Sequence, residues 1–281
     1  SSGTFTSNGT ASVIASGTLS ITSTNWSSPG GFTVNNGTLN LGGTFTLASI
    51  GSFTRVGGAV NIIGTLNNTG NTLGLDATTG SWTLTTGTIV GGTVAATGGA
   101  FLAATFGTLN GVALASDLAI ANNAGVGIIN GLTLSGGATV TVSASASLLF
   151  LSGTQTVSGN GQIVLSSPSG NSSRIRIGTS AAATVTIGAG VTVRGHGTIE
   201  TGVSSSRLIN EGTIQGDVSG RTLTISSGAF TSDGTVSATT SGTLSITSTN
   251  WSSQGGFNVN NGTLNLGGTF TAASIGPFMR V

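Results

Sequence analysis

Six carboxylates are the side chains of this chain best suited to catalysis, because two of them could act together as general acid and base. They are Asp76, Asp117, Glu200, Glu211, Asp217 and Asp233. A glycosidase needs two carboxyl groups about 5–10 Å apart around one glycosidic bond. Only Glu200, Glu211 and Asp217 are close enough in sequence for that, and an equivalent of Asp233 elsewhere in the chain is Asn8. We therefore expect solvated surface charges and no enzymatic activity, with a polysaccharide-degrading enzyme as an alternative.

Arginine is the second informative residue type, because most ionisable groups lie between residues 174 and 221. Five arginines in this segment could form a stripe for an anionic ligand or a lateral contact: Arg174, Arg176, Arg194, Arg207 and Arg221. Arg176 shares a strand face with Arg174, and Arg194 follows Arg174 by about 20 residues, a typical length for one solenoid repeat. The competing interpretation is an exposed ladder of arginine–carboxylate pairs, each worth about 0–1 kcal/mol, that also blocks lateral sheet pairing.

Tryptophan and histidine are candidates for ligand contact. Trp26 and Trp251 lie in the same Thr-Asn-Trp-Ser-Ser segment and could stack on a sugar, although packing against an adjacent loop is the favoured interpretation. His196 is the single histidine and cysteine is absent, so we expect no transition-metal site and no cofactor. Calcium-binding solenoids need Asp in each turn, and the predicted coils of this chain do not have it.

Pairs of threonines one residue apart raise ice binding as a further alternative. They are Thr4 and Thr6, Thr44 and Thr46, Thr83 and Thr85, Thr139 and Thr141, and Thr184 and Thr186. A flat array of hydroxyls would require these pairs to be in register on successive coils. Because their spacing is irregular, we expect ordinary outward-facing strand residues.

Alternation with period two dominates the local sequence, as in Thr18-Leu-Ser-Ile21 and Thr222-Leu-Thr-Ile225. Successive side chains of a strand point to opposite faces, so the apolar residues line one face and the hydroxyls the other. No segment has the apolar spacing of a helix, and we expect no α-helix. Phenylalanines are expected in the core, among them Phe101 and Phe106.

Glycine precedes many of these strands in a Gly-Thr-apolar signature, for example at Gly43, Gly64, Gly87 and Gly107. Glycine at a corner permits close approach of two backbones. Three short strands and three corners in roughly 20–22 residues describe one coil of a parallel β-helix. The fold class predicted is therefore all-β, a β-solenoid, taken as right-handed from the general preference of parallel crossovers.

A long internal repeat is the strongest feature of the sequence. Residues 1–56 return at 226–281 without a gap, with 45 of the 56 positions identical. Periodicity on this scale is typical of stacked, extended architectures, and a sandwich, barrel or propeller fits it less well. We predict that residues 1–225 form one full repeat of a continuous solenoid and that residues 226–281 begin the next.

The composition limits the partners. The chain has 281 residues with 5% charged residues and a net charge of +1, which gives no electrostatic footprint for nucleic acid. The longest apolar run, Leu148 to Leu151, is far shorter than the ~20 residues of a membrane helix. Without cysteine no disulfide framework forms. The chain begins at Ser1 without a methionine, and we expect an internal or processed segment.

Several motifs carry a family resemblance. Gly30-Gly-Phe-Thr-Val-Asn-Asn-Gly-Thr-Leu-Asn-Leu-Gly42 resembles the autotransporter-associated β-strand repeat, with its Gly-Gly-x-x-Val-x-x-Gly-Thr-Leu core. The whole chain is similar to the giant tandem-repeat β-strand repeat surface proteins of bacteria, in the style of the filamentous-haemagglutinin β-helix. The resemblance implies a secreted or cell-surface β-helix and brings no catalytic residue.

The function expected from the sequence is structural. We expect a segment of an extracellular fibre or adhesin stalk whose partners are other copies of the same repeat, end to end and side by side. A glycan-binding module that recognises polysaccharide through the arginines is the main alternative.

Overall fold

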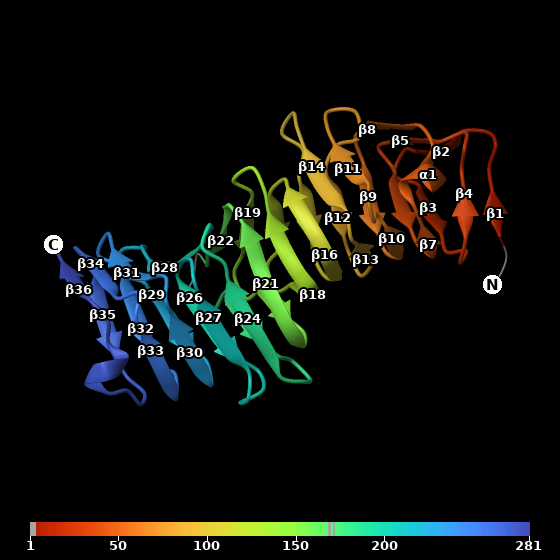
Figure 1. Ribbon diagram of the computed structural model, residues 1–281. Coiled ribbons are helices and arrows are strands. Elements are labelled where there is room, and N and C mark those ends of the chain that lie inside the picture. The colour runs from red at the N-terminus through yellow and green to blue at the C-terminus, as the bar shows by residue number, and fades with distance from the viewer. Residues whose placement is uncertain (1–3, 168–169, 171) are drawn as a thin grey trace.

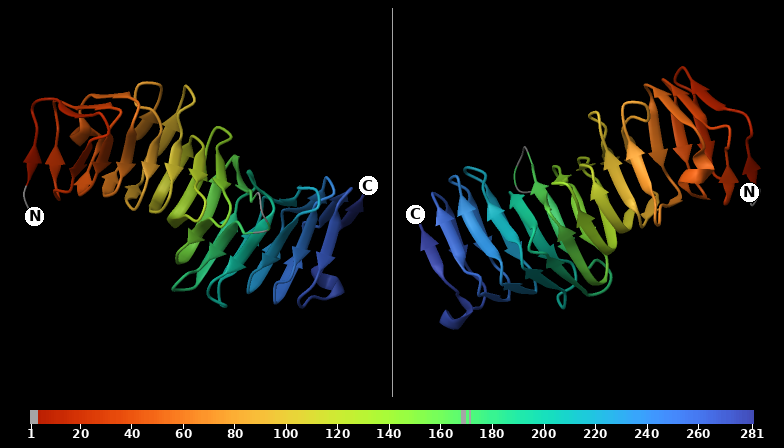
Figure 2. Two further views of the ribbon diagram at one scale, coloured as in Figure 1. Left: turned by 180° about the vertical axis from the view of Figure 1, so that it is seen from behind. Right: turned by 45° about the horizontal axis from the view of Figure 1, so that its top comes forward.

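The chain winds into a rod of stacked parallel coils in the computed structural model, which describes residues 4–167, 170 and 172–281. Figure 1 shows the coils following one another along the rod, and Figure 2 shows the two termini at opposite ends. Every strand pair between coils is parallel, and one sheet alone contains 13 strands. The predicted β-solenoid is thus confirmed, whereas its right-handed coil stays a prediction.

Each coil has three faces, which we number in chain order. The first face is the 13-stranded sheet. Its strands are β3 (Thr18–Ile21), β6 (Thr38–Leu41), β9 (Ala59–Ile62), β12 (Trp82–Leu84), β15 (Leu102–Ala104), β17 (Leu118–Ile120), β19 (Thr139–Val142), β22 (Gly161–Leu165), β25 (Val191–Gly195), β28 (Thr213–Gly216), β31 (Thr235–Thr239), β34 (Phe257–Asn260) and β36 (Phe278–Arg280).

The second face follows the first in each coil, and two of its strands continue onto the third face. Its strands are β1 (Phe5–Thr6), β4 (Trp26–Ser27), β7 (Thr44–Phe45), β10 (Thr65–Asn67), β13 (Thr88–Val90), β16 (Thr108–Ala115), β18 (Gly125–Leu134), β20 (Ser147–Phe150), β23 (Arg174–Ile177), β26 (Gly197–Thr201), β29 (Thr222–Ser226), β32 (Thr243–Ile246) and β35 (Thr263–Leu266).

The third face closes the coil before the chain returns to the first. Its strands are β2 (Ala11–Ile14), β5 (Phe32–Asn35) and β8 (Phe53–Val56), then β11 (Thr72–Leu75), β14 (Thr93–Ala96), the carboxyl-terminal halves of β16 and β18, β21 (Gly153–Gly159), β24 (Ala183–Ile187), β27 (Arg207–Asn210), β30 (Ala229–Ser232) and β33 (Asn250–Ser253).

The length of a coil agrees with the sequence pattern. From Thr18 at the start of β3 to Phe278 at the start of β36 the first face advances by 12 coils in 260 residues, which is about 21.7 residues per coil. At a strand spacing of about 4.8 Å, these coils give a rod about 60 Å long.

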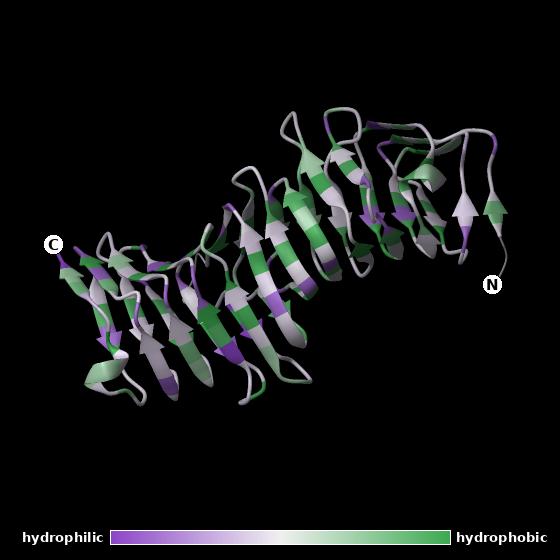
Figure 3. Ribbon diagram, viewed as in Figure 1, coloured by the Kyte–Doolittle hydropathy of each residue, from purple (hydrophilic) through white to green (hydrophobic). Residues whose placement is uncertain are grey.

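A continuous apolar column fills the interior. On the first face, seven successive coils place one fully buried side chain each at the same register position, and all are 0% exposed. They are Leu41, Ile62, Leu84, Ala104, Ile120, Val142 and Leu165. Figure 3 shows the resulting alternation of apolar and polar bands along the strands. Burial at about 25 cal/mol per Å² makes this column the main source of stability.

The corner between the first and second faces explains the Gly-Thr signature. The backbone N–H of Thr65 donates to the carbonyl oxygen of Gly43 one coil below at 2.7 Å, and Thr88 donates to Gly64 at 2.8 Å. A Cβ on Gly64 would lie 2.2 Å from that same Gly43 oxygen, so a side chain cannot fit. Glycine is therefore required for the coils to approach closely, and the following threonine supplies the hydrogen bond.

Helix content is close to zero, as expected, but it is not nil. One helical turn, α1 (Leu47–Ile50), and one 3-10 turn, η1 (Ala272–Ser274), occur at equivalent corners of the two sequence copies. The Thr46 hydroxyl accepts from the backbone N–H of Ser49, and the Ser49 hydroxyl accepts from that of Thr46. These reciprocal bonds satisfy donors at the start of the turn.

Two phenylalanines expected in the core are exposed. The side chains of Phe101 and Phe106 are 38% and 51% exposed, because they lie at the corners on either side of β15 rather than at an inward strand position. Phe32, Phe45 and Phe150 are buried within strands, as expected.

Candidate functional site

The five arginines expected in one stripe are divided among the three faces. Arg174 and Arg176 lie on β23 of the second face, Arg194 on β25 of the first and Arg207 on β27 of the third. Arg221 lies at the corner before β29. The expectation of one stripe was wrong because the coil that starts at Arg174 is longer than 20 residues: Arg174 stands in register with Thr198, 24 residues further on. The spacing between Arg174 and Arg194 therefore does not return to the same face here.

On the second face, Arg174 and Arg176 share one carboxylate. Arg176 stands in register with Glu200 on the next coil, and both guanidinium groups approach the Glu200 Oε1 atom, at 3.5 Å from Arg174 and 3.9 Å from Arg176. The two arginine side chains are about half exposed. Solvent screening makes such pairs worth about 0–1 kcal/mol each. One positive charge in this group of three is left without a compensating negative charge.

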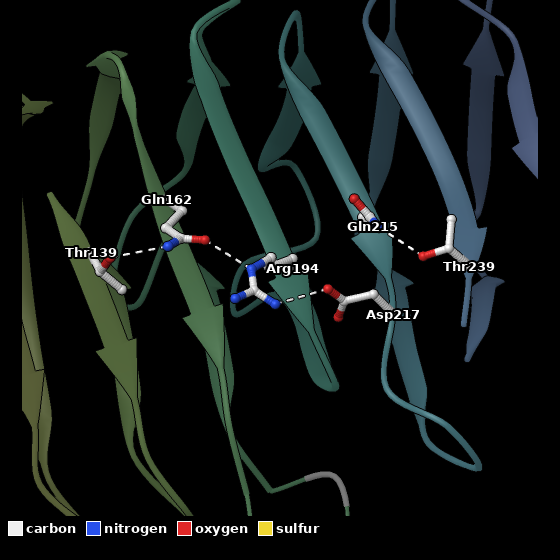
Figure 4. A network of polar contacts seen from close by, with 6 residues as sticks. All are labelled: Thr139, Gln162, Arg194, Gln215, Asp217 and Thr239. Carbon is white, nitrogen blue, oxygen red and sulfur yellow. Dashed lines mark hydrogen bonds and ion pairs between the residues drawn. The ribbon is translucent and has the colours of Figure 1, made fainter. Parts of the chain in front are cut away.

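On the first face, Arg194 belongs to a polar ladder that runs along the rod axis (Figure 4). Its Nε donates to Oε1 of Gln162 on the preceding coil at 2.8 Å, and its Nη1 donates to Oδ2 of Asp217 at 2.9 Å. Gln162 continues the ladder by donating to the hydroxyl of Thr139 at 3.1 Å. The guanidinium group therefore connects three successive coils through two of its N–H groups.

A second short ladder lies beside the first. The Gln215 amide donates to the Thr239 hydroxyl one coil further at 2.7 Å (Figure 4). Arg194 and Gln215 are register neighbours on adjacent strands. Five successive coils of this face are thus joined by side chains as well as by the backbone, which favours a stiffening role for the polar residues.

The third face has a shallow hollow beside Arg207. Arg207, Ala229 and Asn250 occupy one register position on three successive coils, so the small Ala229 side chain lies between two longer ones. The hollow is lined by these residues together with Phe230, Thr231, Trp251 and Ser252, and it is open to solvent.

Both candidate sugar-stacking tryptophans are buried, which corrects that prediction. Trp26 is 4% exposed and Trp251 is 5% exposed. Trp26 packs against Phe32 and Phe45, with ring centroids 5.9 and 5.0 Å away. Because their rings face the interior, neither indole can stack on a sugar at the surface.

Two further acidic residues make structural contacts. The Asp76 carboxylate accepts hydrogen bonds from the backbone N–H groups of Thr78 and Thr79 at 2.8 and 2.9 Å. These two bonds, from Thr79 and then Thr78, lower the pKa of Asp76. Asp117 accepts from the backbone N–H of Thr139 at 2.9 Å. Within the described part of the chain, no group of three or more His, Cys, Asp or Glu could hold a metal ion.

His196 is enclosed rather than presented to solvent. It is 6% exposed, and its Nε2 atom lies 2.7 Å from the carbonyl oxygen of Ser167. This contact ties Ser167, just after β22, to the next coil. A structural role for this side chain follows from the geometry.

Amide ladders at strand positions are the polar feature that sequence reasoning missed. Asn40 donates to the Ser20 hydroxyl at 2.9 Å, and Asn61 donates to Oδ1 of Asn40 at 2.8 Å, both along the first face. Asn130 donates to Asn110 in the same way at 2.7 Å. The recurrence of these polar residues at intervals of one coil is the signal that could have revealed them.

The threonine pairs do not form an array. Of the pairs identified in the sequence, Thr184 and Thr186 have an in-register counterpart pair, Thr154 and Thr156 on the preceding coil. On the following coil the same positions are Arg207 and Ile209. Two rungs of hydroxyls do not provide the flat repeating surface that ice binding requires.

Comparison with known proteins gives little independent guidance. No family model matches the chain, and no curated protein sequence matches it significantly. Among solved structures, the chain is similar to the crystal structure of a TibC-catalysed, hyper-glycosylated TibA fragment, with 21% identity over 98% of this chain and 100% of that chain. The TM-score of 0.23 is too low for this likeness to support an argument. The family resemblance noted above therefore rests on the quoted motifs.

None of the described helices is long and apolar enough to cross a membrane.

Proposed function

We propose that this chain is a structural segment of an extracellular filament or adhesin stalk and that it has no catalytic role. The supporting observation is the junction between the two sequence copies. Strand β29 (Thr222–Ser226), which spans the end of residues 1–225, pairs with β32 of the second copy. Strands β27 and β28 pair likewise with β30 and β31. Among the described residues no linker separates the copies, and the same parallel bonding joins coils within and between them.

The mechanism is architectural. Each coil adds about 4.8 Å, and the buried apolar column continues through the junction, for example from Leu223 to Leu244 and from Ile225 to Ile246. One full repeat, residues 1–225, then extends the rod by about 50 Å. Because each copy contacts its neighbour only at its ends, length is set by copy number and stiffness by the continuous sheets.

The charged residues on the surface favour a role in contacts between coils and between copies over a role in catalysis. Two of the arginines pair with carboxylates along the axis, Arg194 with Asp217 and Arg174 with Glu200. The partners proposed are other copies of the repeat, end to end and side by side. The location proposed is extracellular or at the cell surface, which the motif resemblance supports. A polysaccharide contact is the second candidate, favoured by the hollow beside Arg207.

Cryo-electron microscopy of the native material tests the filament directly. We expect long rods with a rise of about 4.8 Å and a stronger axial period near 50 Å. Discrete particles without axial periodicity would overturn the proposal. For the second candidate, a glycan array is compared between the unaltered chain and Arg207→Ala; binding that this substitution abolishes would favour the polysaccharide contact, and absence of binding would remove it.

A further inference from the structure

The two sequence copies place the same segments on different faces of the rod. The identical sequence Thr-Leu-Ser-Ile forms β3 on the first face and β32 on the second. Trp26 lies on the second face in β4, and its equivalent Trp251 lies on the third in β33. Strand β5 belongs to the third face, and its equivalent β34 belongs to the first. Every equivalent pair moves by one face in the same sense.

The cause is a repeat that does not contain a whole number of coils. Along the first face, ten steps lead from β3 to β31, and β32 is the next strand in the chain. One full repeat, residues 1–225, therefore makes ten coils and one further face, or about ten and one-third coils.

Local packing is preserved while the face changes. The Trp26 indole donates to the carbonyl oxygen of Gly42 at 2.8 Å, and Trp251 donates to Gly267 at 2.8 Å. The corresponding distances to Phe32 and Phe257 are 5.9 and 6.0 Å. In Figure 1, α1 lies toward the upper border of the rod, whereas η1, in blue, projects at its lower border. The shift is thus a rotation of an intact local unit.

We propose that consecutive copies of the long repeat are related by a screw of one face, so that an array presents each surface feature to three sides in turn. This inference rests on the proposed tandem rod. The same residue returns to the same face after three copies, which is about 31 coils and about 150 Å. A partner that recognises one feature of the repeat can then dock from three directions, at sites one repeat apart.

The screw also limits the length over which two rods lying side by side stay matched. Two neighbouring rods that match along one face stay matched over a single copy, because the next copy turns that surface away. Side-by-side contact between two rods is therefore in register for about 50 Å at a time.

Site-specific labels on the 281-residue chain test the rotation. The chain lacks cysteine, so Ala48→Cys with Ala273→Cys marks two equivalent, exposed positions in α1 and η1. A control pair, Thr44→Cys with Thr263→Cys, marks exposed positions on β7 and β35, ten coils apart on the second face. Both double variants are biotinylated, bound to monovalent streptavidin and imaged by cryo-electron microscopy. Circular dichroism melting confirms that each variant folds.

The control pair gives the twist of the sheets over ten coils, and the test pair gives that twist plus the change of face. We expect the two labels of the test pair on different sides of the rod and those of the control pair on one side, after the same axial separation of about 50 Å. Test labels aligned like the control labels would overturn the screw and leave the rod intact. Control labels without this axial separation would instead overturn the rod itself.

Discussion

Trp26 and Trp251 make the same hydrogen bond from different faces of the rod. Each indole donates to a glycine carbonyl oxygen 16 residues further along, at 2.8 Å, and each packs edge-on against a phenylalanine. In the first copy this bond ties a strand of the second face to the corner that precedes the next coil's strand. In the second copy the equivalent bond ties a strand of the third face to the equivalent corner. The local sequence therefore fixes a packed corner, while the number of preceding residues fixes the side on which that corner lies.

Replacement of Trp26 by alanine should destabilise the amino-terminal coils strongly. The ring is 4% exposed and fills the space between Phe32 and Phe45, so the loss of a large buried side chain should cost about 3–5 kcal/mol. Denaturant unfolding followed by circular dichroism measures the change. As a control, Trp26→Phe should cost less.

Because the indoles are buried, soluble polysaccharides should leave the tryptophan fluorescence emission of the unaltered chain unchanged. A saturable change in emission on titration would contradict this and would favour sugar stacking on a tryptophan.

Much of the fold could be predicted from the sequence, because the alternation and the Gly-Thr signature report local geometry. Gly64 and Thr65 suffice to indicate a corner followed by a strand, and the structure has both. The face of each strand could not be predicted, since the same Thr-Leu-Ser-Ile lies on two different faces. That assignment depends on the summed lengths of all earlier coils.

The candidate site was predicted less well for the same reason. Arg174 and Arg194 are separated by nearly the length of an ordinary coil, yet the residue in register with Arg174 is Thr198, 24 residues further on, so Arg194 still lies on the first face. Phe101 and Phe106 are apolar but occupy corners. Composition identified the residues that matter, and coil lengths decided their neighbours.

Replacement of Gly64 by alanine should destabilise the rod through backbone contact alone. The new Cβ would lie 2.2 Å from the Gly43 carbonyl oxygen, which also accepts the Thr65 hydrogen bond, so the coils would have to separate. We expect a loss of about 3 kcal/mol, at the upper end of ordinary single substitutions. The measurement is the midpoint of denaturant unfolding.

Gly74→Ala is the control, because Gly74 in β11 has, like Gly64, no positive φ, and no atom lies within 4 Å of its ideal Cβ position. Its midpoint should stay unchanged or rise slightly, since alanine reduces the entropy of the unfolded chain. Equal destabilisation by both substitutions would mean that strand glycines matter for flexibility and not for close approach.

The two groups of arginines should differ in their contribution to stability. Arg194→Met removes both the Gln162 and the Asp217 contacts and leaves an Asp217 side chain that is 13% exposed without its cation. A loss of about 1–3 kcal/mol follows from the unpaired polar groups. Arg174→Met removes an exposed contact and should cost under about 1 kcal/mol.

The stability contributions of Arg174 and Arg194 should also differ in their dependence on ionic strength. Added sodium chloride should weaken the Arg174 contribution, because exposed pairs are screened, and affect the Arg194 contribution less. Unfolding midpoints of both variants at low and high ionic strength provide the measurement. A larger loss of stability for Arg174→Met than for Arg194→Met would contradict a stabilising role of the polar ladder on the first face.

The turn at Asp76 should make the rod sensitive to acid. Hydrogen bonds from the backbone of Thr79 and Thr78 lower the pKa of Asp76 in the folded state. A carboxyl group whose folded pKa is depressed contributes stability above its unfolded pKa, and that contribution disappears as the pH falls through the folded pKa. Thr78 of this turn also accepts from the backbone of Arg55 on β8, so loosening it affects the neighbouring coil.

The comparison of Asp76→Asn with the unaltered chain isolates this effect. Thermal unfolding should show a lower midpoint for Asp76→Asn at pH 7 and a difference that shrinks as the pH falls below the ordinary pKa of aspartate and the lowered pKa of Asp76 is passed. Asp233→Asn is the matched control, because asparagine already stands at the equivalent position 8, and its midpoint should match the unaltered chain at pH 7. If the Asp76→Asn difference stayed constant across this range, the carboxylate charge would have no part in holding the turn.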